Sequence, residues 1–207
     1  IRDRSIFTQY GRLLLLLVGT MLLMALVINP FIIFIYLHRN PYPLVFRCLR
    51  ESGLTAFFTR SSAANIPVNM AMCEKLGLDK DFYSVSIPLG ATINMDGTAI
   101  YQAVCAVFIA CCYGVQLTLG DMAMIVLTAT LASIGTAGVS GAGMIMLAMV
   151  LTQVGLPVEG IAIIAGVDKI FDMGRTTLNI TGDATCALFI SRLEREKAAK
   201  KAAKAAK

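Results

Sequence analysis

Polar residues recur along a single helical stripe near the end of an otherwise apolar chain. Asp168, Asp172, Arg175, Asn179 and Asp183 follow one another at spacings of 4, 3, 4 and 4 residues. At about 100° per residue, this spacing confines them to an arc of roughly 80° on an α-helix. A charged group in hydrocarbon costs at least about 2.5 kcal/mol. We therefore expect the stripe to line a buried path for ions or charged solutes.

Long uncharged stretches predict three membrane crossings. Residues 13–37 make an apolar run of about 25 residues, long enough to cross a hydrocarbon core of about 30 Å, and Asn29-Pro30 is expected to kink it. Residues 83–113 predict a second crossing, which the sequence TINMDGT is expected to unwind near its middle. Residues 160–190 predict the last crossing, which carries the polar stripe.

Two other apolar stretches have polar or glycine-rich centres and predict re-entrant hairpins. In residues 55–73, TAFF and IPVNMAM are each too short to span, TRSSAAN lies between them, and Pro67 is expected to support the break. Residues 122–158 would make a straight helix of about 55 Å, and their centre, SIGTAGVSGAG, disfavours a helix. Both stretches are expected to fold back at tips buried in protein.

In the resulting order, a unit of one hairpin followed by one crossing occurs twice. Such duplicated units with discontinuous helices are typical of secondary transporters, which hold substrate near the membrane midplane. We predict an all-α membrane protein, a helical bundle with two re-entrant hairpins and broken transmembrane helices. Its expected domains are a preceding helix and linker at 1–52, a transport core at 53–192 and a Lys/Ala-rich tail at 193–207.

Composition agrees with a multi-pass protein of the cell membrane. The chain is 57% hydrophobic and 15% charged, whereas soluble domains carry about 25% charged residues. Most of the net charge of +5 lies in the tail, and no basic patch interleaved with aromatic residues indicates a nucleic-acid partner. A single histidine and the absence of an HExxH motif argue against an enzyme.

The charges at membrane depth do not balance. The basic residues are Arg60, Lys169 and Arg175, and the acidic residues are Asp96, Asp168, Asp172 and Asp183. Asp96 and Asp183 have no basic neighbour in sequence, and buried carboxylates without partners either protonate or bind cations. Amide and carbonyl oxygens lie nearby in sequence and are hard ligands that suit Na⁺. The sequence therefore predicts Na⁺ as the bound ion.

Arg175 and Asp172 suggest a pocket for a zwitterion. A guanidinium can hold a carboxylate at two points, and the Asp172 carboxylate one turn earlier can hold an ammonium group. Hairpin tips would add backbone N–H groups for a second carboxylate. Together these groups predict a small amino acid with an acidic side chain. The alternative is that Asp172 and Arg175 pair with each other, as residues at i,i+3 often do.

Four strings in order carry a resemblance to a known family: TRSSAANIPVNM, SIPLGATINMDGTAIYQ, SIGTAGVSGAGMIMLAMVL and DKIFDMGRTTLNITGD. On these strings the chain resembles the glutamate transporter family of Na⁺-coupled dicarboxylate and amino-acid symporters. The resemblance implies an inverted-repeat transport domain that carries substrate and Na⁺ past a static scaffold by an elevator mechanism. It also implies a homotrimer formed through scaffold helices, which we expect to lie outside this sequence.

The resemblance also implies roles for individual residues. Asp172 would bind the α-amino group, Arg175 the side-chain carboxylate, and Asn179 the α-carboxylate together with the backbone of Ser61 and Ser62. The rest of the implied pocket comprises Arg60, Met95, Thr98, Val139, Gly143, Asp168 and Thr176. The implied sodium ligands are Gly90, Asn94, Asn179 and Asp183 at one site, Thr92, Met95, Ser133, Ile134 and Thr136 at a second, and Asp96 with Asn94 at a third.

We therefore predict Na⁺-coupled symport of aspartate or glutamate, because a buried, unpaired Arg175 would penalise a neutral substrate. One alternative is a serine/threonine or C4-dicarboxylate symporter, since residues 1–93 look more like the serine/threonine branch and the residues from Asn94 onward more like the acidic branch. The other is a scaffold-less module that binds substrate and ions without transport.

Overall fold

The computed structural model describes residues 4–205, and every regular element in that range is helical. The elements in the first half are α1 (Arg4–Leu23), the π-helix η1 (Met24–Ile28), α2 (Asn29–Leu37), α3 (Tyr42–Cys48), the π-helix η2 (Leu49–Gly53), α4 (Leu54–Thr59), α5 (Ser62–Lys75) and α6 (Lys80–Ile93). Those in the second half are α7 (Asp96–Cys112), α8 (Leu119–Ile134), α9 (Ala142–Gln153), the 3₁₀-helix η3 (Val158–Gly160), α10 (Ile161–Ala165) and α11 (Asp168–Ala205).

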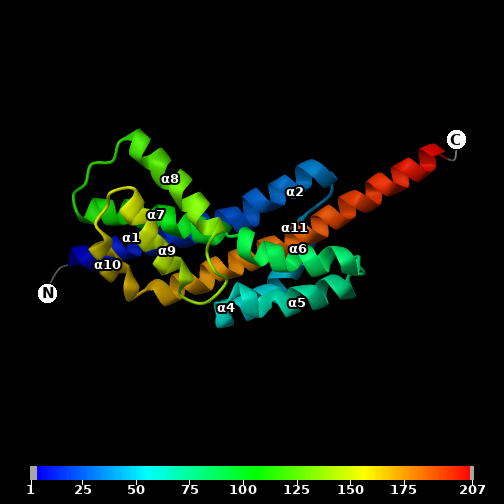
Figure 1. Ribbon diagram of the computed structural model, residues 1–207, viewed down its shortest axis with the longest axis horizontal. Coiled ribbons are helices and arrows are strands. Elements are labelled where there is room, and N and C mark those ends of the chain that lie inside the picture. The colour runs from blue at the N-terminus through cyan, green and yellow to red at the C-terminus, as the bar shows by residue number, and fades with distance from the viewer. Residues whose placement is uncertain (1–3, 206–207) are drawn as a thin grey trace.

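Helix α11 runs along the molecule, and the other helices lie on it in two groups (Figure 1). Helices α1 and α7 contact its first half, and α8 and α9 pack on α7. Helices α4, α5 and α6 lie against its later turns. The largest apolar core joins α1, α7, α9 and α11 through buried side chains such as Leu17, Ile109, Leu147 and Phe171. The polar stripe of α11 thus faces helices from both groups.

The first apolar run forms the continuous helix α1–η1–α2, as predicted. The π-helix η1 lies directly before Asn29-Pro30, where the kink was expected. Pro30 has no N–H to donate, and the wider π turn ahead of it accommodates that loss. Two helical stretches in the described chain, Thr8–Tyr36 and Lys80–Cys112, are long and apolar enough to cross a membrane.

The first hairpin turns within the string TRSSAAN, as expected, but Pro67 has no part in the turn. Pro67 lies inside α5 and does not break it, so the prediction that Pro67 supports the break was wrong. Arg60 makes the turn instead, with φ of 53° in the left-handed region, and Ser61 is extended. The Ser61 side chain then caps α5 by accepting a hydrogen bond from Ala64 N at 3.1 Å.

The second hairpin and the broken crossing form where glycine and polar residues predicted them. Helix α8 ends at Ile134 and α9 begins at Ala142, with a glycine-rich tip between them. The break in the middle crossing is narrower than the string TINMDGT, because only Asn94 and Met95 lie between α6 and α7. The helix expected over residues 160–190 begins later than predicted: α10 stands apart, and α11 continues unbroken from the polar stripe into the Lys/Ala-rich tail.

Candidate functional site

The tips of the two hairpins meet each other beside α11. Gly138, at the tip between α8 and α9, offers its carbonyl oxygen to two donors of the other hairpin. Ser61 Oγ and Ala63 N both donate to it at 2.9 Å. The contact brings the N-terminal end of α5 to the glycine-rich tip (Figure 1). The free N–H groups at such a helix end favour an anionic group.

A small pocket lies between the two tips, the break before α7 and the stripe of α11. It is lined by Arg60, Ser62, Met95, Thr98, Thr136, Ala137, Gly138, Val139, Gly143, Asp172, Arg175, Thr176 and Asn179. The residues expected to bind substrate are among them, with the exception of Ser61 and Asp168. Sequence reasoning missed Ala137 and Gly138, although both belong to the string SIGTAGVSGAG that marked the tip.

Arg175 forms ion pairs with two carboxylates of its own helix, and its Nη2 has no hydrogen-bond partner among the described residues. Its Nε donates to Asp172 Oδ1 at 2.9 Å, and its Nη2 lies 2.8 Å from the same oxygen. Its Nη1 donates to Asp168 Oδ1 at 3.2 Å. The guanidinium also stacks over the ring of Tyr101, with Cζ 4.3 Å from the ring centroid. The pairing of Asp172 with Arg175, left open from the spacing, is the arrangement found.

The second oxygen of Asp172 faces the tip of the second hairpin. Asp172 Oδ2 accepts hydrogen bonds from Ser140 Oγ at 3.2 Å and from Gly141 N at 3.1 Å. Arg60 Nη1 lies 3.9 Å from the same oxygen. Sequence reasoning gave Ser140 and Gly141 no part in the site. The tip therefore rests on the carboxylate that would receive an amino group.

Gly143 allows the Arg175 guanidinium to approach the start of α9. A Cβ at Gly143 would lie 2.6 Å from Cζ and 2.7 Å from Nη1 of Arg175. Atoms that close would force the guanidinium to move, so the position needs a residue without a side chain. The geometry explains why a glycine lines this side of the pocket.

Asn179 connects the pocket to the break between α6 and α7. Its Oδ1 accepts a hydrogen bond from Gly97 N at 2.7 Å, and its Nδ2 donates to Thr98 Oγ1 at 2.9 Å. Its backbone oxygen accepts from Asn94 Nδ2 at 2.8 Å. The Asn179 side chain thus holds the unwound segment against α11. Because Asn179 also lines the pocket, a movement of the unwound segment would alter the shape of the pocket.

A buried carboxylate lies one turn further along α11. Asp183 is 3% exposed, and its Oδ2 has no hydrogen-bond partner among the described residues. A Cβ at Gly90 would overlap the Asp183 carboxylate, so the two positions are in immediate contact. Asn94 N donates to Gly90 O at 2.8 Å, and Asn94 Nδ2 donates to Asn179 O at 2.8 Å. The structure therefore brings together the four residues of the first expected sodium site.

The other expected sodium ligands are less tightly grouped. The hydroxyls of Thr92, Ser133 and Thr136 each donate to a carbonyl of their own helix. Met95 and Thr136 line the same pocket, whereas Ile134 is 46% exposed. Backbone carbonyls and hydroxyl lone pairs at these positions remain the oxygen donors that Na⁺ would use.

Asp96 lies at the start of α7, close to α11. A Cβ at Gly182 would lie 3.7 Å from Asp96 Oδ2, so this carboxylate lies beside the residue that precedes Asp183. Among the side chains that the structure describes, neither Asp96 nor Asp183 takes part in an ion pair.

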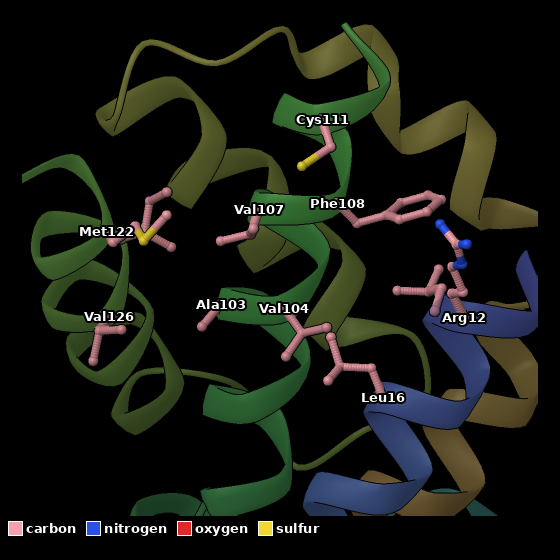
Figure 2. A pocket seen from close by; sticks show the side chains of 11 residues that line it. Arg12, Leu16, Ala103, Val104, Val107, Phe108, Cys111, Met122 and Val126 are labelled. Atoms are coloured by element: carbon pink, nitrogen blue, oxygen red, sulfur yellow. The ribbon is translucent and has the colours of Figure 1, made fainter. Parts of the chain in front are cut away.

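A second hollow, on the outside of the first group of helices, is apolar. Figure 2 shows side chains of α1, α7 and α8 around it, among them Leu16, Val104, Phe108 and Met122. Arg12 is the one charged residue in its lining and points toward Phe108. Aliphatic walls of this kind suit acyl chains or another helix, so the hollow is not a candidate for a charged solute.

Comparisons with known proteins agree with a transporter. Residues 3–193 match the model of the sodium:dicarboxylate symporter family. The serine/threonine transporter SstT of Bifidobacterium adolescentis is 53% identical over 189 residues, which cover 88% of this chain and 44% of that relative. The relative's name fits the serine/threonine alternative and gives no support to an acidic substrate. As a multi-pass protein of the plasma membrane, the chain belongs to the sodium:dicarboxylate symporter family.

Proposed function

We propose that this chain is the transport portion of a Na⁺-coupled symporter for a small neutral amino acid, serine or threonine. The observation that carries this proposal is the balance of charge around the pocket. Two guanidinium groups, those of Arg60 and Arg175, lie with the two carboxylates of Asp168 and Asp172. A substrate without net charge keeps that balance, and the relative of 53% identity is named as a serine/threonine transporter.

The pairing of Arg175 removes the main argument for an acidic substrate. That argument required an unpaired guanidinium, which a substrate carboxylate would neutralise. Arg175 already contacts both Asp168 and Asp172, and its side chain is 3% exposed. An added carboxylate would leave one buried negative charge in excess, and uncompensated buried charges are strongly unfavourable. A zwitterion with a hydroxyl side chain brings no such excess.

The contacts suggest how a neutral amino acid would bind. Its ammonium group would replace the Ser140 hydroxyl and the Gly141 N–H at Asp172 Oδ2. Its carboxylate would lie at the N-terminal end of α5, where Ser62 lines the pocket. The Thr176 hydroxyl is a neutral group left for the substrate side chain, beside the Thr98 hydroxyl that accepts from Asn179. Met95, Val139 and Gly143 would limit its size.

Sodium coupling is proposed from the two carboxylates that lack a basic partner. Asp183 would bind one Na⁺ with Gly90, Asn94 and Asn179, and Asp96 would contribute to another. The ligands are carboxylate, amide and carbonyl oxygens, which are the donors that Na⁺ prefers. Because Asn179 belongs to both the pocket and the Asp183 site, occupation of one would change the other.

The movement across the membrane is also a proposal. Residues 53–192 would form an elevator-type transport domain, with α4–α5 and α8–α9 as re-entrant hairpins. The chain spans 44% of the relative's length, so a scaffold, and with it a homotrimer, would come from sequence outside these residues. Binding without transport by the isolated chain remains the alternative within this proposal.

Aspartate or glutamate is the second candidate substrate. One observation favours it, namely that Arg175 lies in the pocket lining. For a substrate carboxylate to use this guanidinium, Arg175 would have to release Asp168 or Asp172, and the freed carboxylate would then need another cation. The neutral substrate requires no such exchange, and for that reason we rank it first.

Equilibrium binding tests the proposal. The chain, purified in lipid nanodiscs, is incubated with labelled L-serine, L-threonine or L-aspartate in NaCl or in choline chloride at equal ionic strength. We expect serine and threonine to bind in NaCl alone, with aspartate at least tenfold weaker. Preferential binding of aspartate would establish the second candidate. Uptake of the same labelled amino acids by proteoliposomes that contain this chain then separates transport from binding.

A further inference from the structure

The apolar hollow between α1, α7 and α8 has no part in the proposed function (Figure 2). Its volume is about 450 Å³, and every lining residue except Arg12 is hydrophobic. The walls of such a hollow lose van der Waals contacts when nothing fills it. In a membrane protein, an occupant from the surrounding bilayer or from another chain is therefore expected.

The two ends of the hollow differ in polarity. Three helix boundaries meet at one end, because α7 ends at Cys112, α8 begins at Leu119, and the apolar run of α1 starts directly after Arg12. In Figure 2, Arg12 lies toward this end and Val104 toward the other. Arginines next to a membrane crossing keep their charge at the boundary with water. The hollow thus has a cationic end at the membrane surface and an apolar end within the hydrocarbon.

The guanidinium of Arg12 is available to an anionic group. Arg12 is exposed, and among the side chains that the structure describes it takes part in no ion pair. Asp121, at the start of α8, accepts hydrogen bonds from Thr118 instead. Arginine binds phosphate groups through two parallel hydrogen bonds. The cationic end of the hollow therefore suits the phosphate of a lipid.

The dimensions of the hollow favour an acyl chain over another helix. On α7 its lining runs from Ala103 to Cys111, a length of about 12 Å along the helix. A helix with its side chains is about 10 Å across, so the same length of helix would occupy about 900 Å³. The hollow has about 450 Å³, which is too narrow for a helix, whereas an extended acyl chain is one methylene group wide.

We propose that the hollow binds an anionic phospholipid, with the lipid phosphate on Arg12 and one acyl chain between α1, α7 and α8. The helix α8 leads to the tip of the second hairpin, which rests on Asp172. A lipid in this position would therefore also hold the first arm of that hairpin against α7. The site lies outside the substrate pocket and requires no particular substrate or coupling ion.

The chain offers a matched control for each part of this site. Arg39 is an exposed arginine at the other end of the same crossing and is not part of the lining. Val85 in α6 is 65% exposed and lies outside the lining, so it is the control for Val104. Cys111 and Cys112 are both exposed, but only Cys111 lines the hollow.

Native mass spectrometry of the full chain in detergent measures the dissociation constant of the first bound lipid. The probes are phosphatidylglycerol and phosphatidylcholine with the same acyl chains. We expect wild type to bind phosphatidylglycerol about fivefold more tightly, the preference that one basic side chain gives to an anionic lipid. Arg12→Gln should abolish this preference, and Arg39→Gln should keep it. Val104→Phe, which narrows the hollow, should weaken the binding of both lipids, and Val85→Phe should weaken neither.

Alkylation by N-ethylmaleimide in the same detergent locates the lipid. Added phosphatidylglycerol should slow the reaction of Cys111 and leave that of Cys112 unchanged. Equal slowing of both thiols would place the lipid outside the hollow and overturn the proposal. So would equal dissociation constants of the two lipids in wild type, or a preference in Arg12→Gln equal to that of wild type.

The mass spectra also test the other occupants of the hollow. A dimer that replaces the lipid-bound chain, and that is lost in Val104→Phe, would make a second copy of the chain the occupant and overturn the lipid site. Unchanged affinities of both lipids in Val104→Phe would likewise exclude an acyl chain from the hollow. Should Val104→Phe not fold, Ala103→Leu takes its place, because Ala103 lines the same wall of α7.

Discussion

Arg175 and Asp172 form an ion pair on one face of α11, with Nε and Nη2 at 2.9 and 2.8 Å from a single carboxylate oxygen. Asp168 holds the other end of the same guanidinium at 3.2 Å. These side chains are at most 7% exposed, so water contributes little to their stabilisation. The start of α11 therefore holds one buried guanidinium between two buried carboxylates, and the three groups must be considered together.

Removal of Arg175 is expected to be strongly destabilising. The substitution Arg175→Leu leaves Asp168 and Asp172 buried without their shared partner, and breaking a buried pair in this way costs about 3–5 kcal/mol. Thermal unfolding of the chain in nanodiscs measures the loss. The matched control is Arg47→Leu, because Arg47 forms an ion pair of 2.9 Å with Glu51 on the surface.

Exposed pairs of this kind contribute about 0–1 kcal/mol, so the control should unfold close to wild type. Equal losses of stability in the two variants would contradict the buried network. A gain of stability in Arg175→Leu would likewise contradict the expected cost of leaving the two carboxylates without their partner.

The contact between Ser140 and Asp172 predicts a competition with substrate. The hydroxyl occupies the carboxylate oxygen that the ammonium group of an amino acid would use. Ser140→Ala removes a hydrogen bond worth about 1 kcal/mol, and L-serine should then bind about fivefold more tightly. The control is Thr152→Ala, since that hydroxyl bonds Ala148 O within its own helix. Weaker serine binding by Ser140→Ala would instead make Ser140 a ligand of the substrate.

The start of α8 carries a pH-dependent cap. The side chain of Thr118 accepts from Asp121 N at 3.2 Å, while the Asp121 carboxylate accepts from Thr118 N and Oγ1 at 2.8 Å. These two donors hold the pKa of Asp121 below its ordinary value. A carboxylate with a lowered pKa in the folded state stabilises it above the ordinary pKa, and that stabilisation is lost as pH falls through the lowered one.

NMR titration of labelled aspartate measures this effect. Thr118→Val removes the hydroxyl donor and keeps the backbone N–H, so the pKa of Asp121 should rise part of the way to its ordinary value. Asp121→Asn should abolish the pH dependence of the cap. An Asp121 pKa that does not move in Thr118→Val would show that the backbone N–H alone accounts for the lowered value.

Local chemistry made much of the fold predictable. The glycine-rich tip, the unwound Asn94-Met95 segment and the stripe on α11 follow from residues close together in sequence, where helix periodicity and backbone preference decide. Pro67 misled for the same reason: the rule for proline predicts a break, yet the left-handed Arg60 and the cap at Ser61 already provide the turn. The preference of one residue for a helix break has no effect when neighbouring residues already make the turn.

Contacts between distant residues were not predictable from one sequence. Gly138 O accepts from Ser61 and Ala63 of the other hairpin, and Asn179 bonds Gly97 and Thr98, across separations that no helical period covers. The state of Arg175 was ambiguous for a related reason. Its spacing from Asp172 suits an ion pair within the helix and also a guanidinium that binds substrate. Only the three-dimensional structure shows that Arg175 contacts both Asp168 and Asp172.

The last prediction concerns the contact between Gly90 and Asp183. A Cβ at Gly90 would overlap the carboxylate, so Gly90→Ala must push the Asp183 side chain out of its present position. We expect the half-saturating Na⁺ concentration for serine binding to rise at least tenfold, because displaced ligands weaken metal binding by about that factor.

The control for this substitution is Gly19→Ala in α1, where a Cβ would meet no atom within 4 Å. Replacing glycine by alanine inside a helix stabilises it by about 0.5–1 kcal/mol when no clash results, so Gly19→Ala should keep wild-type sodium dependence with an equal or higher Tm. Gly90→Ala receives the same gain in helix propensity but loses the carboxylate geometry. An unchanged sodium dependence in Gly90→Ala would therefore exclude Asp183 as a sodium ligand, whatever the variant does to stability.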